Sequence, residues 1–242
     1  MSQRKGATTA GHAETEVKPQ GQAQNKQAIL LAQDAGHFSL IKAMHLADVI
    51  TEMNGFCGFM SVLSAMRYCL GDRTDTGNLW AAFFFMPFGL FFDLFDGKVA
   101  RWRQKSSLMG QELDSLADLI SFGVAPASVG FAIGLQTFTD QILLSFYVLC
   151  GLTRLARFNV TVAMLPKDKT GKSKYFEGTP IPFACLTSSA IMATLTFMDM
   201  IHGNLPLGTA LTGTALEFHP LAVLFIINGV LMTSRSIHVP KP

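Results

Sequence analysis

Residues 93–118 read DLFDGKVARWRQKSSLMGQELDSLAD, and they run from the end of one apolar segment, at 79–92, into the next, at 115–134. Four of these residues are aspartates, spaced as two pairs: Asp93 with Asp96, and Asp114 with Asp118. Residues three or four apart share one face of a helix, so each pair projects from one face. Two such helices lying face to face would bring four carboxylates together at their shared end.

Carboxylates at this density repel one another unless a cation lies between them. The stretch contains no His or Cys, and ligands that are all oxygen favour Mg²⁺ or Mn²⁺ over zinc. Small residues on the same faces leave room for a ligand beside the backbone: Gly97, Ala100 and Gly110. Arg101 adds a guanidinium suited to phosphate oxygens. Together they predict a metal-dependent diphosphate site, although each feature taken singly also fits an ordinary charged loop.

The composition indicates that this site belongs to a membrane protein. Of the 242 residues, 49% are hydrophobic and only 15% are charged, and the mean hydropathy is +0.33, which is too apolar for most soluble folds. The formal net charge of +2 is too small to indicate a nucleic-acid partner. The cysteines lie inside apolar segments without a CxxC pair, so we interpret them as reduced packing residues.

Six apolar segments predict an all-α fold of six transmembrane helices, at 53–70, 79–92, 115–134, 141–162, 183–201 and 219–233. Lys and Arg concentrate in the connections after the second and fourth segments, whereas the other three connections contain only Arg73. Short basic loops face the cytoplasm. The distribution therefore predicts six spans with both termini and the acidic cluster on the cytoplasmic side.

Two segments precede the first predicted span. Residues 1–35 have the composition of a disordered cytoplasmic tail and lack the apolar core of a secretory signal, which leaves 36–242 as the membrane domain. Between 37 and 50, apolar residues recur at helical spacing around Lys42, His45 and Asp48. This pattern predicts an N-terminal amphipathic helix lying along the membrane surface. An amphipathic helix packed on the protein fits the same pattern.

The pattern D-x2-D-G-x2-A-R-x8-G-x3-D-x3-D is present without a departure, and chance would produce its eight fixed identities on the order of 10⁻⁷ times in such a chain. The sequence at roughly 50–235 resembles the CDP-alcohol phosphotransferases. The resemblance implies a six-helix membrane enzyme, commonly a homodimer, that binds two divalent metal ions through Asp93, Asp96, Asp114 and Asp118. It further implies that Asp118 is the catalytic base. The residues implied to hold the CDP group are Gly97, Ala100, Arg101 and Gly110, with Ser115 and Asn54 beside them.

Three segments resemble the phosphatidylserine synthases within this family: ELDSLADLISFGVAPA at 112–127, RLARFNV at 154–160 and FEGTPIP at 176–182. Thr179 stands where many relatives have Leu, so we assign no role to its side chain. The resemblance implies transfer of the phosphatidyl group of CDP-diacylglycerol to L-serine, with release of CMP. The tail and the connecting sequences are more similar to the fungal than to the bacterial enzymes, which implies a location in the endoplasmic reticulum.

Two arginines in the fourth apolar segment, Arg154 and Arg157, need anionic partners at such a depth. The resemblance places Arg157 and Phe158 in the serine pocket. For Arg154, either the serine carboxylate or the nucleotide phosphates could be the anionic partner. A structural ion pair with Glu112 or Glu177 is the alternative for either arginine.

The motif alone does not choose the acceptor alcohol, so inositol, glycerol 3-phosphate and choline stay open beside serine. The lysines at 167–174 leave room for an acceptor that carries its own phosphate. A divalent cation transporter is the alternative from a different class. Its ion sites would have to line a path across the membrane, whereas the acidic residues are bunched at one end.

Overall fold

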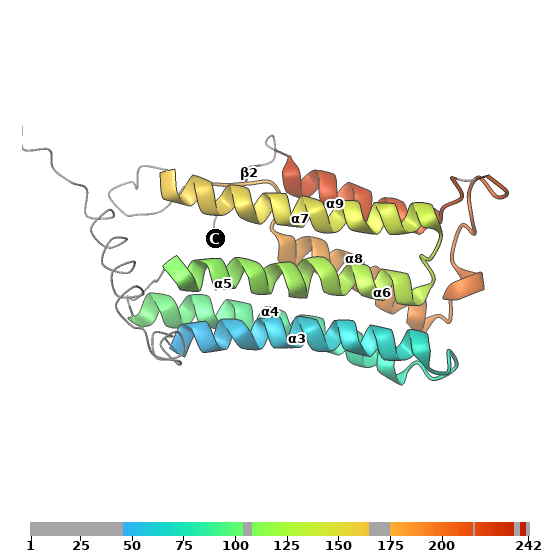
Figure 1. Ribbon diagram of the computed structural model, residues 1–242, viewed down its shortest axis with the longest axis horizontal. Coiled ribbons are helices and arrows are strands. Elements are labelled where there is room, and N and C mark those ends of the chain that lie inside the picture. The colour runs from blue at the N-terminus through green and yellow to red at the C-terminus, as the bar shows by residue number, and fades with distance from the viewer. Residues whose placement is uncertain (1–45, 104–107, 165–174, 215, 235–237, 241–242) are drawn as a thin grey trace, which may run out of the picture. The chain divides into compact units, whose positions relative to one another are not determined.

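The computed structural model describes residues 46–103, 108–164, 175–214, 216–234 and 238–240. Within them the structure is helical apart from one short pair of antiparallel strands, β1 (Tyr175–Glu177) and β2 (His238–Pro240) (Figure 1). The α-helices are α3 (Leu46–Leu70), α4 (Gly77–Arg103), α5 (Leu108–Asp118), α6 (Ala125–Ile133), α7 (Phe138–Met164), α8 (Ile181–Phe197) and α9 (Val223–Thr233). Shorter helical elements are the π-helix η1 (Leu119–Val124) and the 3₁₀ turns η2 (His202–Asn204) and η3 (Pro220–Ala222). The predicted all-α class is confirmed.

Each of the six predicted apolar segments falls on helical structure. Four helical runs are long and apolar enough to cross a membrane: Ala47–Leu70, Gly77–Val99, Met109–Ile133 and Phe138–Val160. The other two, Ile181–Phe197 and Pro220–Thr233, are apolar but shorter. The structure therefore supports a membrane protein with four helices of spanning length, and six crossings stay a prediction.

The predicted surface helix differs from what the structure describes. Residues 1–45 lie outside the described part of the chain, and with them the tail and most of the segment at 37–50. Residues 46–50 form the start of α3, which continues to Leu70 without a break. Asp48, expected on a solvated face, is only 4% exposed, as is Thr51 one turn further on. No Gly or Pro separates these residues from the first span, so nothing in the sequence ends the helix there.

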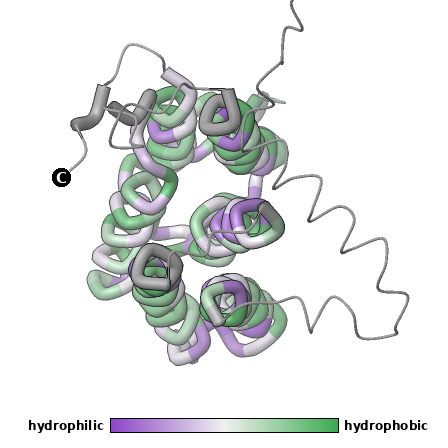
Figure 2. Tube along the Cα trace, turned by 90° about the vertical axis from the view of Figure 1, so that its left-hand side faces the viewer, coloured by the Kyte–Doolittle hydropathy of each residue, from purple (hydrophilic) through white to green (hydrophobic). Residues whose placement is uncertain are grey.

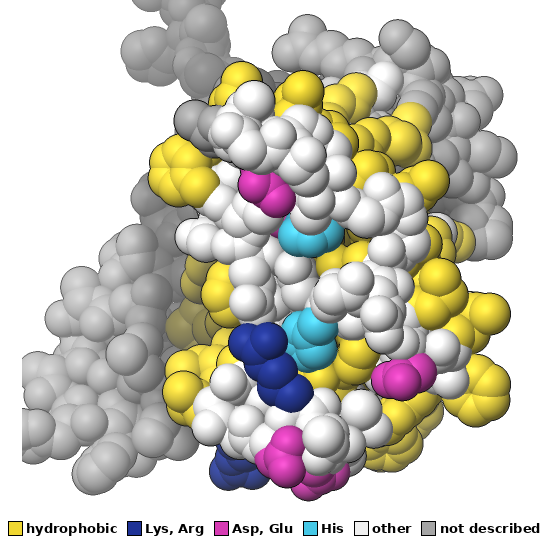
Figure 3. Space-filling model, turned by 90° about the vertical axis from the view of Figure 1, so that its right-hand side faces the viewer, with side chains coloured by type: hydrophobic (Ala, Val, Ile, Leu, Met, Phe, Trp, Pro, Cys, Tyr) yellow, Lys and Arg dark blue, Asp and Glu magenta, His cyan; other side chains and the backbone are white. Residues whose placement is uncertain are grey.

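Successive helical runs alternate in direction, which gives the described helices two ends (Figure 1). At one end α4 and α7 finish and α5 begins, and we call it the acidic end because it carries the aspartates of residues 93–118. The other end, which we call the far end, holds the turns at 71–76 and 134–137 and the loop at 198–222. Figure 3 views the far end, where Lys and Arg side chains are sparse.

Two glycines of α3 face the run from α5 to α6, and the close packing depends on the second. A Cβ atom on Gly58 would collide with Ser121, whereas a Cβ on Gly55 would lie 3.5 Å from the Cβ of Ala117, which is an ordinary contact. Small residues at such crossings let two backbones approach. Because the helices approach closely, the side chains at the start of α3, before these glycines, come within reach of the aspartates of α5.

The π-helix η1 interrupts this central run directly after Asp118. The N–H of Ala125 bonds to the carbonyl of Ile120, five residues earlier, instead of the residue four earlier. Pro126 has no N–H, so the carbonyl of Phe122 cannot receive the usual helical hydrogen bond from it. The buried hydroxyl of Tyr147 on α7 donates to that carbonyl at 2.8 Å. The irregular turn is thereby tied to the neighbouring helix.

Hydrophobic residues predominate along the helices, as the colouring in Figure 2 shows from the acidic end, and many large ones are exposed. On α4 a row of phenylalanines is exposed: Phe84, Phe88, Phe91 and Phe95. Such a surface suits the hydrocarbon interior of a membrane. Many polar groups inside are paired, for example Asn228 of α9, which donates from Nδ2 to Ser188 Oγ of α8 at 2.9 Å.

Candidate active site

Three of the four motif aspartates meet between α4 and α5. Asp93 comes from the end of α4, and Asp114 and Asp118 come from one face of α5. Each offers a carboxylate oxygen, and the three oxygens all lie within 4.8 Å of one another. The predicted approach of the two acidic helices is therefore present in the structure.

Helix α3 positions the last of these carboxylates. Asn54, which is fully buried, donates from Nδ2 to Asp118 Oδ1 at 3.1 Å. Ser121 donates its hydroxyl to the backbone carbonyl of Asn54 at 2.8 Å. A side chain at Gly89 of α4 would press on the Asn54 amide oxygen, because a Cβ there would lie 2.9 Å from it. Asn54, expected beside the CDP group, thus contacts Asp118, one of the predicted metal ligands.

Asp96 lies apart from the other three aspartates. The Thr51 hydroxyl on α3 donates to Asp96 Oδ2 at 2.6 Å, and the Asp96 side chain is 7% exposed. Residues three apart differ by about 60° around a helix, so Asp93 and Asp96 need not point to one spot. Instead of one cage of four carboxylates, the structure shows a group of three and a fourth that is held by α3.

The donor set fits a hard divalent cation. The three grouped side chains offer only oxygen, and like charges this close repel unless a cation lies between them. Asp114 Oδ1 is buried and has no hydrogen-bond partner among the described residues. A buried carboxylate oxygen without a partner is costly, and a metal ligand bond would satisfy it.

A small pocket of about 160 Å³ opens beside Asp114 and Asp118. Its other lining residues come from α5, α7 and the start of α8: Gln111, Ser115, Arg154, Leu155, Phe158, Asn159, Pro180 and Pro182. Arg154 Nε is buried, and no described residue bonds to it. The pocket therefore combines a carboxylate wall with a guanidinium group whose Nε has no hydrogen-bond partner among the described residues. Its volume is enough for one small polar molecule.

A hydrogen-bonded bridge at this pocket joins α5 to α7. Ser115 Oγ donates to Asn159 Oδ1 at 3.1 Å, and Asn159 Nδ2 donates to Glu112 Oε2 at 3.2 Å. Ser115 Oγ also lies 3.2 Å from the carbonyl oxygen of Gln111 on its own helix. Glu112, one of the two acids considered as an ion-pair partner for the arginines, is thus engaged by Asn159.

The two predicted acceptor-pocket arginines occupy different places. Arg154 lines the pocket together with Phe158. Arg157 instead donates from its guanidinium to the carbonyl of Thr233, at the end of α9, at 3.3 Å. The other acid considered as a partner, Glu177, lies in β1, and its side chain is outside the described part of the chain.

The remaining predicted residues lie on the two acidic helices. Gly97 follows Asp96 on α4, and Gly110 lies one turn before Asp114 on α5. Ala100 and Arg101 belong to the last turn of α4, and their side chains are outside the described part of the chain. The lysines at 167–174 are outside it as well.

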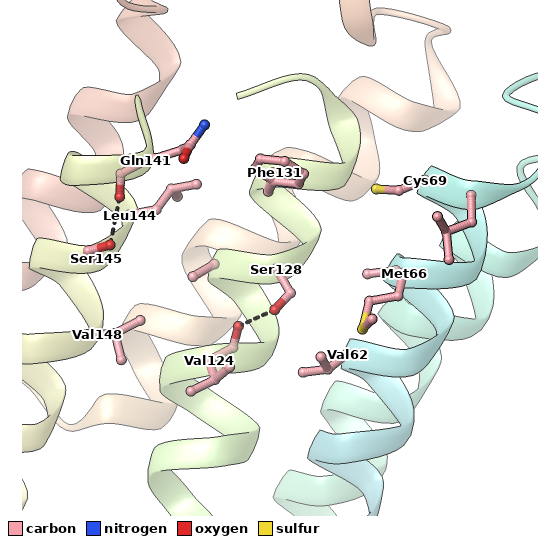
Figure 4. Close-up of a pocket in the computed structure, with 13 residues that line it drawn as sticks. Val62, Met66, Cys69, Val124, Ser128, Phe131, Gln141, Leu144, Ser145 and Val148 are labelled. Carbon is pink, nitrogen blue, oxygen red and sulfur yellow. Dashed lines mark hydrogen bonds between the residues drawn. The ribbon is translucent and has the colours of Figure 1, made fainter. Parts of the chain in front are cut away.

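A larger cavity of about 540 Å³ lies between α3, α6 and α7, nearer the far end (Figure 4). Its lining is apolar, with Val62, Met66, Phe131 and Leu144 among the residues that face it. Its two serines direct their hydroxyls to their own helices, Ser128 to the carbonyl of Val124 and Ser145 to that of Gln141. With no charged residue in its lining, this cavity cannot bind a diphosphate or a metal ion, and the smaller pocket is the candidate active site.

Sequence reasoning missed four contributors to this site. Thr51 precedes Asn54 by three residues, so their shared helical face was readable as a polar stripe in an apolar segment. Asn159, Pro180 and Pro182 all lie within the quoted segments at 154–160 and 176–182. No sequence signal brings those two segments together, because they are joined only through the folded structure.

Comparisons with known proteins show the family to which the chain is similar. Residues 44–230 match the CDP-alcohol phosphatidyltransferase family. The chain is 53% identical over 210 residues to a CDP-diacylglycerol–serine O-phosphatidyltransferase of Saccharomyces cerevisiae, covering 86% of this chain and 75% of that protein. It is 37% identical over 142 residues to the Bacillus subtilis protein of the same name, covering 58% and 71%. It is 36% identical over 152 residues to an archaetidylserine synthase of Methanothermobacter thermautotrophicus, covering 62% and 58%.

Proposed function

Because the chain belongs to the CDP-alcohol phosphatidyltransferase family, we propose that it transfers the phosphatidyl group of CDP-diacylglycerol to the hydroxyl of L-serine and releases CMP. The relatives named for serine support this acceptor over inositol, glycerol 3-phosphate and choline. The observation in the structure that carries the proposal is the small pocket in which Asp118 and Arg154 face the same space.

The acidic group is the proposed metal site. Asp93, Asp114 and Asp118 would hold one divalent ion, Mg²⁺ or Mn²⁺, and Asp96 would complete the ligands of a second. When bound, these ions would neutralise the diphosphate and polarise the oxygens that attack and leave. The Thr51 and Asn54 side chains would fix the orientation of the carboxylates before any ion binds.

The chain's own residues account for recognition and proton transfer. Arg154 would pair with the serine carboxylate, because its Nε has no described partner and a guanidinium binds a carboxylate with two parallel bonds. Phe158 would pack against the small aliphatic part of the acceptor. With the acceptor held there, Asp118 would accept the hydroxyl proton as the serine oxygen bonds to the phosphatidyl phosphorus. The bond from that phosphorus to the bridging oxygen breaks, CMP leaves with that oxygen on its single phosphate, and this phosphate would contact Arg101.

The setting of the enzyme is proposed from charge distribution and resemblance. The basic connections at 98–105 and 167–174 join helices at the acidic end, so this end would face the cytoplasm, where serine and the charged nucleotide are dissolved. Both termini would lie on that side. A location in the endoplasmic reticulum and a homodimeric state are expected from the resemblance to fungal enzymes and to the family.

One experiment tests the proposal directly. Purified protein in detergent is incubated with CDP-diacylglycerol, Mg²⁺ or Mn²⁺, and each candidate alcohol in turn, and the CMP formed is measured. We expect CMP release with serine only, and its loss on addition of a chelator. Release of CMP with inositol, glycerol 3-phosphate or choline at a similar rate would show that serine is not the specific acceptor. A protein that bound divalent ions but released no CMP with any alcohol would contradict the transferase.

A further inference from the structure

The C-terminus of α9 receives two hydrogen bonds from other parts of the chain. The last carbonyls of an α-helix have no partner within the helix. The backbone N–H of Thr179 donates to the carbonyl of Leu231 at 3.2 Å, and the guanidinium of Arg157 donates to that of Thr233 at 3.3 Å. Arg157 therefore caps α9, and a cation at a helix C-terminus is favoured by the helix dipole as well.

The segment beside this helix end forms one wall of the proposed acceptor pocket. Gly178 has a φ of +75° and lies so close to the carbonyl of Met232 that a Cβ would collide with it. Two residues further on, Pro180 begins the turn into α8, and Pro180 and Pro182 line the pocket. Any shift of the α9 terminus would thus be passed to this wall through the backbone of Gly178 and Thr179.

The position of Arg157 on α7 places it away from the pocket. Four α7 residues line the pocket: Arg154, Leu155, Phe158 and Asn159. At 3.6 residues per turn, Arg157 lies about 130° around the helix from the middle of that face. It is adjacent to Phe158 in sequence, but its guanidinium reaches α9 on another side.

We propose that Arg157 is a positioning residue, which holds the Gly178–Pro182 wall of the acceptor pocket by capping α9 and makes no contact with serine. This inference rests on the proposed function, because the pocket it concerns is the proposed serine pocket. It predicts that loss of Arg157 weakens serine binding through the wall. The FEGTPIP segment and the RLARFNV segment, which are far apart in sequence, would then act as one unit.

The test compares Arg157→Ala, Arg157→Lys and Gly178→Ala, with Arg154→Ala as the matched control on the same helix. Two quantities are measured on folded protein in detergent: the KM for serine, and the hydrogen–deuterium exchange of the peptide that contains the Thr179 amide. Exchange is measured without serine, so it reports the wall and not the ligand. The KM for CDP-diacylglycerol and the Mn²⁺ concentration for half-maximal activity are recorded as references.

We expect Arg157→Ala to raise the serine KM roughly tenfold and to speed exchange at Thr179 to a similar degree, since a charge-assisted hydrogen bond is lost. Gly178→Ala should have effects of similar size, because its Cβ would collide with the carbonyl of Met232 and displace the wall. Arg157→Lys should restore most of both properties, because a single N–H donor is enough for a carbonyl. Arg154→Ala should raise the serine KM at least as much without changing exchange at Thr179. The double variant Arg157→Ala/Gly178→Ala should be little worse than either single one.

Two results would overturn the inference. One is a raised serine KM in Arg157→Ala with unchanged exchange and no recovery in Arg157→Lys, which would indicate a direct contact with the serine carboxylate. The other is faster exchange with an unchanged serine KM, which would mean that the wall has no effect on the acceptor. Failure of the proposed function is distinguishable from both, because the wild-type protein would then release no CMP with serine.

Discussion

The two ends of the helices each bury an aspartate among polar neighbours, yet the two environments differ in one respect. At the far end Asp140 is fully buried, and both of its oxygens are used. Oδ2 lies 2.6 Å from His219 Nδ1 and accepts the N–H of Thr137 at 3.2 Å, while Oδ1 accepts the backbone N–H of His219 at 2.8 Å. At the acidic end, Asp114 Oδ1 and Arg154 Nε are buried and lack a partner among the described residues.

This difference separates a structural acid from a functional one. A buried polar group that is fully hydrogen-bonded stabilises the fold, and Asp140 fastens the loop before α9 to the start of α7. Thr137 and Asp140 also bond to each other's backbone N–H, as in a capping box at a helix start. A buried charged group left without a partner costs stability, and at the acidic end a ligand would supply the missing bonds of Asp114 and Arg154.

The largest effect should come from Asp118→Asn. The amide keeps the shape of the side chain and can still accept the Asn54 hydrogen bond, but it can neither take the serine proton nor supply a full charge to the metal site. We expect turnover to fall roughly 10²–10⁴-fold, the range for loss of a positioned base. The measurement is CMP release at saturating substrates.

The control for this variant is stability. Because Asp118→Asn removes one of three mutually repelling charges, the melting temperature in detergent without metal should not fall. Binding of CDP-diacylglycerol should persist. Near-wild-type CMP release would show that another residue takes the proton.

Asp140→Ala should show the converse behaviour. It leaves His219 and the Thr137 N–H without an acceptor in a buried place, so the free energy of unfolding should fall by about 3 kcal/mol. Turnover per folded molecule should stay close to that of the wild type. Unfolding in detergent and CMP release on the remaining folded fraction measure the two quantities. Loss of activity without loss of stability would place a function at the far end.

Much of this layout was predictable, because it depends on local periodicity and charge. The apolar segments, the faces of Asp114 and Asp118, and the approach of α4 to α5 follow from helical spacing and from the repulsion that a shared cation relieves. The end of a helix is harder to predict. The pattern at 37–50 predicts an amphipathic helix in which Lys42, His45 and Asp48 are solvated, whereas residues 46–50 begin α3 and Asp48 is buried.

Apart from the faces of Asp114 and Asp118, the side of a helix that meets a given neighbour could not be predicted. Arg154 and Arg157 look equivalent in sequence, and only the packing of α9 against α7 separates a pocket residue from a cap. Asp96 likewise belonged to one predicted face with Asp93, but it bonds to Thr51 instead. The π-helix after Asp118 has no periodicity of its own over six residues, and it depends on contacts with α3 and α7.

Thr51→Val tests whether Asp96 is a metal ligand or, like Asp140, an aspartate with a structural role only. Valine keeps the shape of threonine but removes the donor to Asp96. If Thr51 orients a metal ligand, the Mn²⁺ affinity should fall roughly tenfold, by loss of a hydrogen bond to a charged group. Mn²⁺ binding followed by electron paramagnetic resonance measures this without turnover. Thr51→Ser should bind Mn²⁺ as the wild type does, and a Thr51→Val variant with wild-type affinity would make the bond purely structural.

The smallest effect is expected between the two ends, at Tyr147. Its hydroxyl satisfies the Phe122 carbonyl, which the imide nitrogen of Pro126 cannot serve. Tyr147→Phe should lower the free energy of unfolding by about 0.5–1.5 kcal/mol, because hydrogen bonds between membrane helices contribute modestly. Pro126→Ala introduces a backbone N–H near the same carbonyl, so the double variant Tyr147→Phe/Pro126→Ala should regain most of that loss. Unfolding curves of the four proteins in one detergent give the coupling between the two positions.

If the bond only stabilises the π-helix, CMP release per folded molecule stays constant through the series. A fall in turnover that follows the loss of the hydroxyl and is reversed by Pro126→Ala would show that this turn also positions Asp118. A fully hydrogen-bonded group in the middle of the membrane would then contribute to function as well as to stability.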